Sequence, residues 1–460
     1  MNDAQTLPAD EADGLPPKER RMALLTVAIA IAMAVLDGAI ANIALPQIAR
    51  ELHATPADSI WVVNAYQLAV TVSLLPLAAM GDIAGYRRVY MFGLSLFTVA
   101  SLGCGLATTM PLLIAARVVQ GFGAAGIMSV NTALIRFTFP RAQLGRGVGI
   151  SALVVATSSA AGPTIAAAIL SIASWHWLYL MNIPLGIIAV LLATRSLPVT
   201  PLSGSRFDWI SALLSAASFG FLLTGLDGFG HDEAHIFVAA EFILGAIATT
   251  IFIRRQNRMA APLLPVDLFR KPIFALSVAT SICSYAAQTI AYISLPFYFA
   301  VGGNMSQTQI GLLITPWPAV IVLIAPLAGR LSDRYPAGLL GGIGLAVLTV
   351  GLFVLNLLPS DPAFIDAVWR MMLSGIGFGF FQSPNNRALI SAAPRSRSGV
   401  ASGVLSTSRL TGQTLGGVTV AVIFGLMAGH IGEEVHTALT VAAAFSGIAC
   451  VISFLRLKQA

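Results

Sequence analysis

Five ionisable side chains lie inside long apolar stretches of this sequence, where burying a charge is costly: Asp37, Arg117, Glu241, Arg370 and Arg409. In a chain that crosses a bilayer, such residues mark a functional site by default. Asp37 lies deep in its apolar stretch, so its carboxylate must be ion-paired, bathed by a water-filled cavity, or protonated. Each of these states suits a proton carrier. The alternative is a structural charge, or a cation-binding charge, that never titrates.

Arg117 begins the segment R-V-V-Q-G-F-G-A-A-G. Gln120 follows three residues later, so the two side chains share one face of a helix. The glycines of this segment allow another helix to approach closely. Glu241 lies near the end of a different apolar stretch, where it could act as a secondary acid or cation contact, or could simply reach water.

Uncharged polar and aromatic residues recur on single faces of several apolar stretches. Such faces can line a cavity with hydrogen-bonding and aromatic surface, which suits amphipathic organic cations or neutral drugs better than sugars or phosphates. The alternative is that these residues hold helices together by hydrogen bonds. The candidate cavity residues, with the charged Arg409 added to the uncharged ones, are Asn64, Gln67, Gln120, Tyr285, Gln288, Tyr292, Gln382, Asn385, Asn386, Arg409 and Gln413.

Two short charged loops add a second kind of candidate site. The segment Ala78–Arg88, A-A-M-G-D-I-A-G-Y-R-R, is partly repeated 251 residues later by Gly329–Arg334, G-R-L-S-D-R. An aspartate in such a loop can accept hydrogen bonds from the amides that begin the next helix, or can pair with a nearby arginine. We expect a conformational latch, with ordinary turn charges as the alternative. Its residues are Asp82, Arg87, Arg88, Asp333 and Arg334.

The elements that must position these residues are membrane-spanning helices. Of the 460 residues, 57% are hydrophobic and 10% are charged, whereas about 25% of a soluble domain is charged. Fourteen apolar stretches are long enough to cross a bilayer, and each must be a helix to satisfy its backbone in lipid. The net charge of +6 comes from short basic loops and does not indicate nucleic-acid binding. The three cysteines lack metal-ligand spacing.

Lysine and arginine set the predicted orientation. With both termini in the cytoplasm, 22 of the 26 basic residues fall in cytoplasmic segments and one, Arg50, in an outer loop, in keeping with the positive-inside rule. The offset between the charged loops is longer than six helices need, and the surplus is the pair Asp208–Leu226 and Ile236–Ile253. We therefore predict an all-α membrane protein of six plus two plus six helices. Its parts are a cytoplasmic tail (1–21), two six-helix bundles (22–195 and 272–460) and a two-helix insertion with basic linkers (196–271).

Several of these segments resemble the motifs of one transporter family. The loop G-D-x-x-G-x-R-R, the segment R-x-x-Q-G-x-G-A-A and the sequence Q-S-P-N-N-R are similar to motifs of the major facilitator superfamily, in its fourteen-helix drug:proton antiporter branch. The chain departs from the first motif at Ala78, Ile83 and Tyr86, and from its second copy at Pro336. The resemblance implies that Asp37 and Arg117 are partners in proton coupling.

The fifth apolar stretch resembles the antiporter motif of the superfamily, G-x8-G-x3-G-P-x2-G-G. Gly149, Gly162 and Pro163 match it, whereas Ser158 and the alanine pair at 166 and 167 replace glycines. All three replacements are small, so close helix packing and a proline kink are retained. The replacements weaken the inference of antiport without removing it.

The resemblance also implies two pseudo-symmetric bundles around a central cavity that opens alternately to either side. The implied function is proton-coupled efflux of amphipathic, chiefly cationic drugs or biocides across the bacterial cytoplasmic membrane. The alternative is a facilitator-type exporter of a metabolite, siderophore or lipid-like molecule. We expect a small-molecule substrate, protons and the bilayer as partners, with no cofactor and a monomeric state. The sequence lacks metal, P-loop, nucleophile-elbow and filter motifs, which argues against an enzyme, an ATP-driven pump or a channel.

Overall fold

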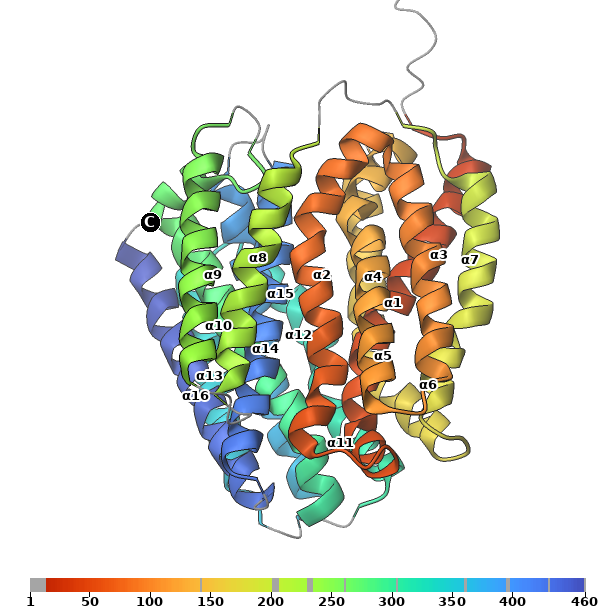
Figure 1. Cartoon of the computed structure of the whole chain (residues 1–460). Coiled ribbons are helices and arrows are strands. Elements are labelled where there is room, and N and C mark those ends of the chain that lie inside the picture. Colours follow the sequence, from red (N-terminus) through yellow and green to blue (C-terminus); the bar gives the residue numbers. More distant parts are fainter. Residues whose placement is uncertain are drawn as a thin grey trace, which may run out of the picture.

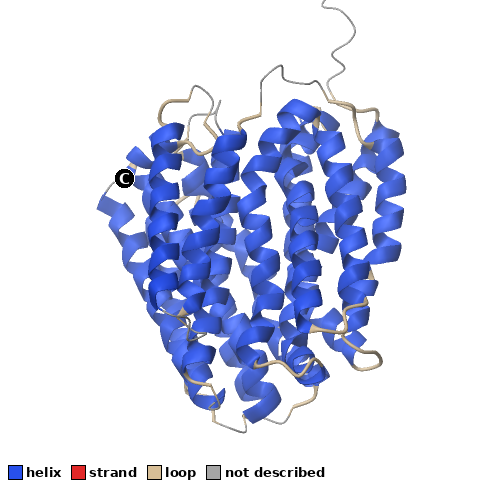
Figure 2. Ribbon diagram, in the orientation of Figure 1, coloured by secondary structure: helices blue, strands red, loops and turns tan. Residues whose placement is uncertain are grey.

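The computed structural model describes residues 14–140, 143–200, 207–229, 235–259, 262–302, 305–359, 362–393, 398–428 and 431–458. Every regular element in these ranges is helical (Figure 2). In these ranges, thirteen segments are long and apolar enough to cross a membrane. Helix α15 (Ser398–Leu426) is 29 residues long and is not one of these thirteen segments, but it packs beside them in the bundle (Figure 1). The predicted all-helical membrane class is therefore confirmed.

The first group of helices packs mainly on itself. Helices α3 and α4 are in close contact because glycines leave room between them: a Cβ on Gly123 would lie 2.5 Å from the backbone nitrogen of Phe97. The group comprises α1 (Pro17–Glu51), α2 (Pro56–Ala84), α3 (Tyr86–Gly105), α4 (Met110–Thr138), α5 (Leu144–Leu170), α6 (His176–Leu180) and α7 (Asn182–Ser196).

Two helices, α8 (Trp209–Gly228) and α9 (His235–Gln256), pack on one another. Helix α8 also contacts α2 and α15, and Figure 1 shows it between α9 and α2. Only 22% of the most apolar part of α9 is buried. Its outer face is therefore free to meet lipid.

The second group of helices follows a 3₁₀ turn, η2 (Val266–Arg270). One apolar stretch that the sequence predicts as continuous is interrupted at Thr315, because Pro316 has no N–H with which to continue the helix. The group comprises α10 (Pro272–Phe297), the π-helical turn η3 (Tyr298–Gly302), α11 (Gln307–Ile314), α12 (Pro316–Leu331), α13 (Ala337–Asn356), α14 (Phe364–Ser391), α15, α16 (Ile431–Leu455) and the 3₁₀ turn η5 (Arg456–Lys458).

Helices α1, α2 and α5 of the first group contact α10, α11, α12 and α15 of the second. The hydroxyls of Thr164 and Thr315 lie 2.9 Å apart, and those of Thr71 and Thr414 lie 3.3 Å apart. These contacts lie at mid-helix and toward one end of the molecule. We call the other end, where α2 meets α3, α12 meets α13 and α16 ends, the basic end; it is at the top of Figure 1.

Candidate functional site

The structure brings Asp37 of α1 into direct contact with Arg117 of α4. Both side chains are fully buried, and Arg117 Nη1 donates a hydrogen bond to Asp37 Oδ2. Glycine-rich α4 approaches α2 closely enough for this, since a Cβ on Gly121 would lie 2.6 Å from the carbonyl oxygen of Tyr66. These are the two residues that the motif resemblance pairs with each other.

Neutral amides complete the shell of the Asp37 carboxylate. Gln120 Nε2 and Asn182 Nδ2 each donate to Asp37 Oδ1 at 2.9 Å. Gln120 also accepts from Arg117 Nη1 at 2.6 Å and donates to Ser101 Oγ at 2.9 Å. Asp37 thus receives only donors, which is the shell that an ionised, acceptor-only carboxylate requires.

The Arg117 guanidinium also contacts a backbone carbonyl and two aromatic rings. Its Nε donates to the carbonyl of Val62 at 2.8 Å. Its central carbon lies 4.2 Å from the ring centre of Tyr66 and 5.5 Å from that of Tyr179. Within the described residues, Nη2 has no hydrogen-bond partner, so the aromatic faces supply part of its stabilisation.

Because Arg117 is buried, its stability depends on the negative charge of Asp37. Removing one partner of a buried ion pair leaves the other uncompensated, at a cost of about 3–5 kcal/mol. A proton on Asp37 would have that effect on Arg117. Helices α1 and α4 would then have to move, or another charge or water would have to enter. A change in the protonation state of Asp37 would therefore require a rearrangement around Arg117.

Four members of this site were missed by sequence reasoning: Ser101, Asn182 and the rings of Tyr66 and Tyr179. Asn182 is fully enclosed at 1% exposure and begins α7. Its polar amide within an apolar stretch was a signal, but such amides are common as helix–helix contacts. Only the packing of α7 on α1 shows which partner it has.

The predicted cavity residues fall into several environments. Gln120 belongs to the Asp37 shell described above. Asn64 is 1% exposed and both its amide atoms lack a partner among the described residues; it faces Gly417 of α15 in the other helix group. Asn385 donates to Ser281 Oγ at 2.8 Å, which matches the helix-joining alternative.

Aromatic candidates on α10 lie against α14 and α12. Gln382 Nε2 donates to Tyr285 OH at 2.9 Å. Tyr292 packs edge-on against Trp317, with ring centres 5.1 Å apart. The remaining candidates are buried or half-buried: Gln67, Gln288, Asn386, Arg409 and Gln413. Among the described residues, the buried Nε of Arg409 has no hydrogen-bond acceptor.

The two charged loops form contacts within their own helix groups. Asp82 accepts from the hydroxyl of Tyr86 one turn later, and Arg87 Nη2 donates to the carbonyl of Thr194 at 2.5 Å. Asp333 pairs with Arg387 of α14. Arg88 and Arg334 are exposed. The aspartates thus accept from a tyrosine and from an arginine of α14, not from the loop arginines.

The residues of the antiporter-like motif lie on α5. A Cβ on Gly162 would lie 2.6 Å from the Cβ of Ala39 on α1, whereas one on Gly149 would meet no atom within 4 Å. Pro163 lies at the contact between helix groups, since its carbonyl oxygen is 2.6 Å from where a Cβ of Gly311 would be. Ser158 is buried at 7% exposure.

Glu241 belongs to a different part of the molecule. It packs on α9 against Gly225 of α8. Its Oε2 atom is buried and lacks a hydrogen-bond partner among the described residues. Its described contacts therefore lie inside the α8–α9 pair.

The amino-acid sequence of this chain is similar to those of known membrane transporters. A model of the Major Facilitator Superfamily matches residues 27–417. The uncharacterized transporter YebQ of Escherichia coli (strain K12) is 54% identical over 98% of this chain and 99% of its own length. The riboflavin transporter RibZ of Clostridioides difficile (strain 630) is 30% identical, with 87% of each protein covered. The multidrug resistance protein Stp of Mycobacterium tuberculosis is 29% identical over 86% of this chain and 74% of its own.

A solved structure has the same fold. It is the structure of a bacterial homolog of the human lysosomal transporter Spinster, in an inward-facing and unoccupied conformation. It aligns with a TM-score of 0.69 at 16% sequence identity, over 97% of this chain and 98% of the other. At this identity the likeness concerns the fold alone.

Proposed function

The chain belongs to the Major Facilitator Superfamily, and we propose that it exports amphipathic organic compounds, chiefly cationic drugs or biocides, in exchange for protons. Membership in this family makes it a multi-pass bacterial membrane transporter and not an enzyme. The drug-resistance relative Stp supports drugs as cargo. The proposal needs no cofactor, because the proton gradient supplies about 2.3 kcal/mol per proton for each 100 mV of membrane potential, besides the pH difference.

One observation carries the proton coupling: the fully buried Asp37–Arg117 pair with its shell of amide donors. In our proposal a proton entering from outside neutralises Asp37 and frees Arg117. The α1–α4 contact then loosens, and the protein changes the side to which its cavity opens. Release of the proton on the other side restores the pair and resets the transporter.

Asp37→Asn tests this proposal. The amide keeps the shape of the side chain but cannot take up and release a proton. We expect uphill export in energised inverted vesicles to be lost, while the variant still reaches the membrane and still exchanges substrate down its gradient. Export of wild-type protein should also collapse when an uncoupler is added. Uphill export by Asp37→Asn at the wild-type rate would refute the role of this carboxylate.

A second candidate function has a specific observation in its favour. The relative RibZ is a riboflavin transporter and is 30% identical over 87% of its length. Export of a metabolite would use the same fold with a different cavity. A resistance profile of overexpressing cells across cationic dyes, biocides and antibiotics, compared with the metabolites in their medium, separates the two functions.

We further propose the arrangement of six plus two plus six helices, with α8 and α9 outside the transport path. Two facts support it: α9 packs on α8, and, in the described part of the chain, the main contacts of α8 with the two helix groups are with α2 and α15. In this proposal the basic end faces the cytoplasm and the transporter acts as a monomer. Cysteine labelling of the loops from either side of the membrane tests the orientation.

A further inference from the structure

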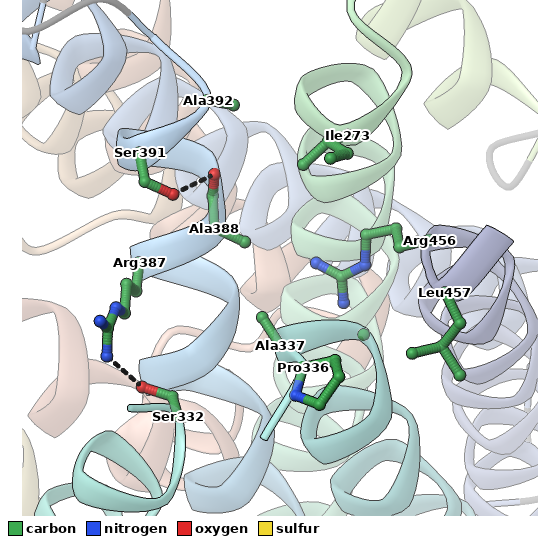
Figure 3. A pocket seen from close by; sticks show the side chains of 11 residues that line it. Ile273, Ser332, Pro336, Ala337, Arg387, Ala388, Ser391, Ala392, Arg456 and Leu457 are labelled. Carbon is green, nitrogen blue, oxygen red and sulfur yellow. Dashed lines mark hydrogen bonds between the residues drawn. The ribbon is translucent and has the colours of Figure 1, made fainter. Parts of the chain in front are cut away.

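A cavity of about 290 Å³ lies at the basic end, among α10, α13, α14 and η5 (Figure 3). Its walls include Ala337, Arg387, Ala388, Arg456 and Leu457. All its lining residues belong to the second helix group. It is therefore separate from the Asp37 site, which is built from α1, α2, α3, α4, α6 and α7.

Arg456 is a buried cation in the wall of this cavity, with an exposure of 3%. Its Nη1 donates to Asn385 Oδ1 at 2.6 Å and to Ser277 Oγ at 3.1 Å, and its Nη2 donates to Ser453 Oγ at 2.5 Å. These acceptors are neutral, and no carboxylate among the described residues pairs with it. Burial lowers the pKa of Arg456 to about 10, which still leaves it charged at neutral pH.

A buried charge without a counter-charge is unusual, because buried ions are normally paired. Arg117 of the same protein illustrates the usual case, since it has Asp37 as its partner. The hydrogen bonds of Arg456 fix its geometry without neutralising it. An anion in the adjoining cavity would supply the missing charge.

The rest of the cavity is also suited to an anion. Arg387 Nη1 donates hydrogen bonds to Asp333 Oδ1 and to Ser332 Oγ, and the Arg387 side chain remains 52% exposed. Lys271 Nζ donates to the carbonyl of Ala392 in the cavity wall at 3.0 Å. Helix α13 begins at Ala337 in the same wall without a side-chain cap, so its positive end faces this region.

The mouth of the cavity is bordered by apolar surface. Leu457, which lines it, is 38% exposed, and Tyr335, which precedes the lining residue Pro336 in the chain, is 51% exposed. An ordinary ion would leave these side chains uncovered, whereas acyl chains attached to a phosphate would cover them. Basic cavities between membrane helices are places where acidic headgroups bind.

We propose that this cavity is a phosphate-binding site, filled by the headgroup of an anionic phospholipid or by a free phosphate ion. The buried Arg456 and the exposed Arg387 hold the phosphate oxygens from two sides, and the exposed leucine and tyrosine favour the lipid. The bound phosphate ties η5 to α13 and α14. It also competes with Asp333 for Arg387. This inference is independent of which substrate the transporter carries.

The test uses the full chain, purified in detergent and stripped of lipid. Phosphatidylglycerol, phosphatidylcholine and inorganic phosphate are titrated separately at matched ionic strength, and the midpoint of thermal unfolding is followed. Stabilisation by phosphatidylglycerol alone identifies a lipid site. Stabilisation by inorganic phosphate as well identifies a site for the phosphate group itself. An equal response to phosphatidylcholine and phosphatidylglycerol, with none to inorganic phosphate, would overturn the proposal.

Three variants locate the binding. Arg456→Gln and Arg387→Gln each remove one cation, and each should weaken binding by about tenfold or more, as expected for loss of a charge-assisted hydrogen bond. Ala337→Phe keeps both cations and fills the cavity, so it should weaken binding even if Arg456→Gln proves too unstable to measure. Arg254→Gln, an exposed arginine of α9, is the control. The proposal fails if the control loses as much affinity as the cavity variants, or if Arg387→Gln and Ala337→Phe bind as wild type does.

Discussion

The guanidinium of Arg117 does more than carry a charge. Its Nη1 donates to both Asp37 and Gln120, its Nε donates to the carbonyl of Val62, and its plane lies against the ring of Tyr66. A lysine would keep the charge, but it has one nitrogen and no planar group to stack on the ring. Geometry and charge can therefore be separated by substitution at this position.

We expect Arg117→Lys to reduce proton-driven export by about tenfold or more, because at least one buried acceptor loses its partner. Arg370→Lys is a matched control: Arg370 pairs with Asp366 one turn earlier on its own helix, at 2.7 Å, and is only partly buried. That variant should export nearly as wild type does. Rates measured in energised vesicles, normalised to the amount of protein, decide the comparison, and equal losses in both variants would contradict the proposed role of Arg117.

The sequence predicted the charged members of the site but not the neutral ones. Asp37 and Arg117 stand out because a charge within an apolar stretch is rare and demands a partner. Asn182 and Tyr66 do not stand out, because amides and tyrosines occur throughout such stretches for packing. Arg456 does not stand out either, because in the sequence it is one of the basic residues that fall in cytoplasmic segments. Its burial depends on how η5, which follows α16, packs against α13, and local sequence does not specify this.

At the scale of elements, helix α5 shows how a motif acts through packing. Gly162 lies where a Cβ would be 2.6 Å from the Cβ of Ala39, and Ala39 is two residues from Asp37 on α1. Gly149 on the same helix faces open space. The two glycines therefore allow one substitution to be compared in a crowded and an uncrowded position.

Gly162→Ala should force α5 away from α1 and destabilise the protein by about 1–3 kcal/mol, the usual cost of overpacking. Gly149→Ala should be neutral or stabilising by up to about 1 kcal/mol, because alanine is the better helix former. Thermal unfolding and vesicle export measured on both variants test this. A loss at Gly149 as large as at Gly162 would mean that helix flexibility, not the α1–α5 contact, is what the motif preserves.

The predicted helices were largely correct because apolar length and charge determine them, even where α15 carries many hydroxyl and glycine residues. The sequence did not show the interruption at Thr315, although Pro316 is visible in it. Pro316 could have kinked a continuous helix. Gly311, four residues before Thr315, lies close to α5. This contact involves a helix far away in the chain, so local sequence could not reveal it.

At the basic end, an ion pair between Asp208, which precedes α8, and Arg255 of α9 holds these two helices together. Burial alone would raise the pKa of Asp208, but hydrogen bonds from Arg255 and Ser211 outweigh it and hold that pKa below its ordinary value. Arg255 Nη2 lies 2.9 Å from Asp208 Oδ1. The folded state thus favours the charged carboxylate.

The ion pair between Asp208 and Arg255 should be lost at acidic pH, when Asp208 is protonated. Because the pKa of Asp208 is lowered by folding, its stabilising effect is present above the ordinary value of about 3.9 and is lost as pH falls through the folded value. Asp208→Asn should therefore unfold at a lower temperature than wild type at pH 6, and the difference should shrink below about pH 4. Thermal unfolding at a series of pH values measures it. A difference that does not change with pH would show that the lost interaction is not the charged one.

At the scale of the whole molecule, the two helix groups meet away from the basic end, through pairs such as Thr164 with Thr315. At the basic end, Asp82 and Asp333 are engaged inside their own groups, with Tyr86 and Arg387 respectively. In the alternating cycle that we propose, this end closes in another state, in which the aspartates exchange these partners for partners across the interface.

Asp82→Asn tests whether this loop governs conformation. The substitution removes the charge at a loop on the protein surface, distant from the buried Asp37 site, so it should alter the balance between inward-facing and outward-facing states. Turnover should fall. Apparent affinities for chemically different substrates should change by one common factor, because only the fraction of binding-competent protein changes. Direct binding of two unrelated substrates in detergent measures that factor. If Asp82→Asn weakens binding of one substrate and spares the other, then Asp82 contacts substrate, and the loop contributes to selectivity instead of acting as a latch.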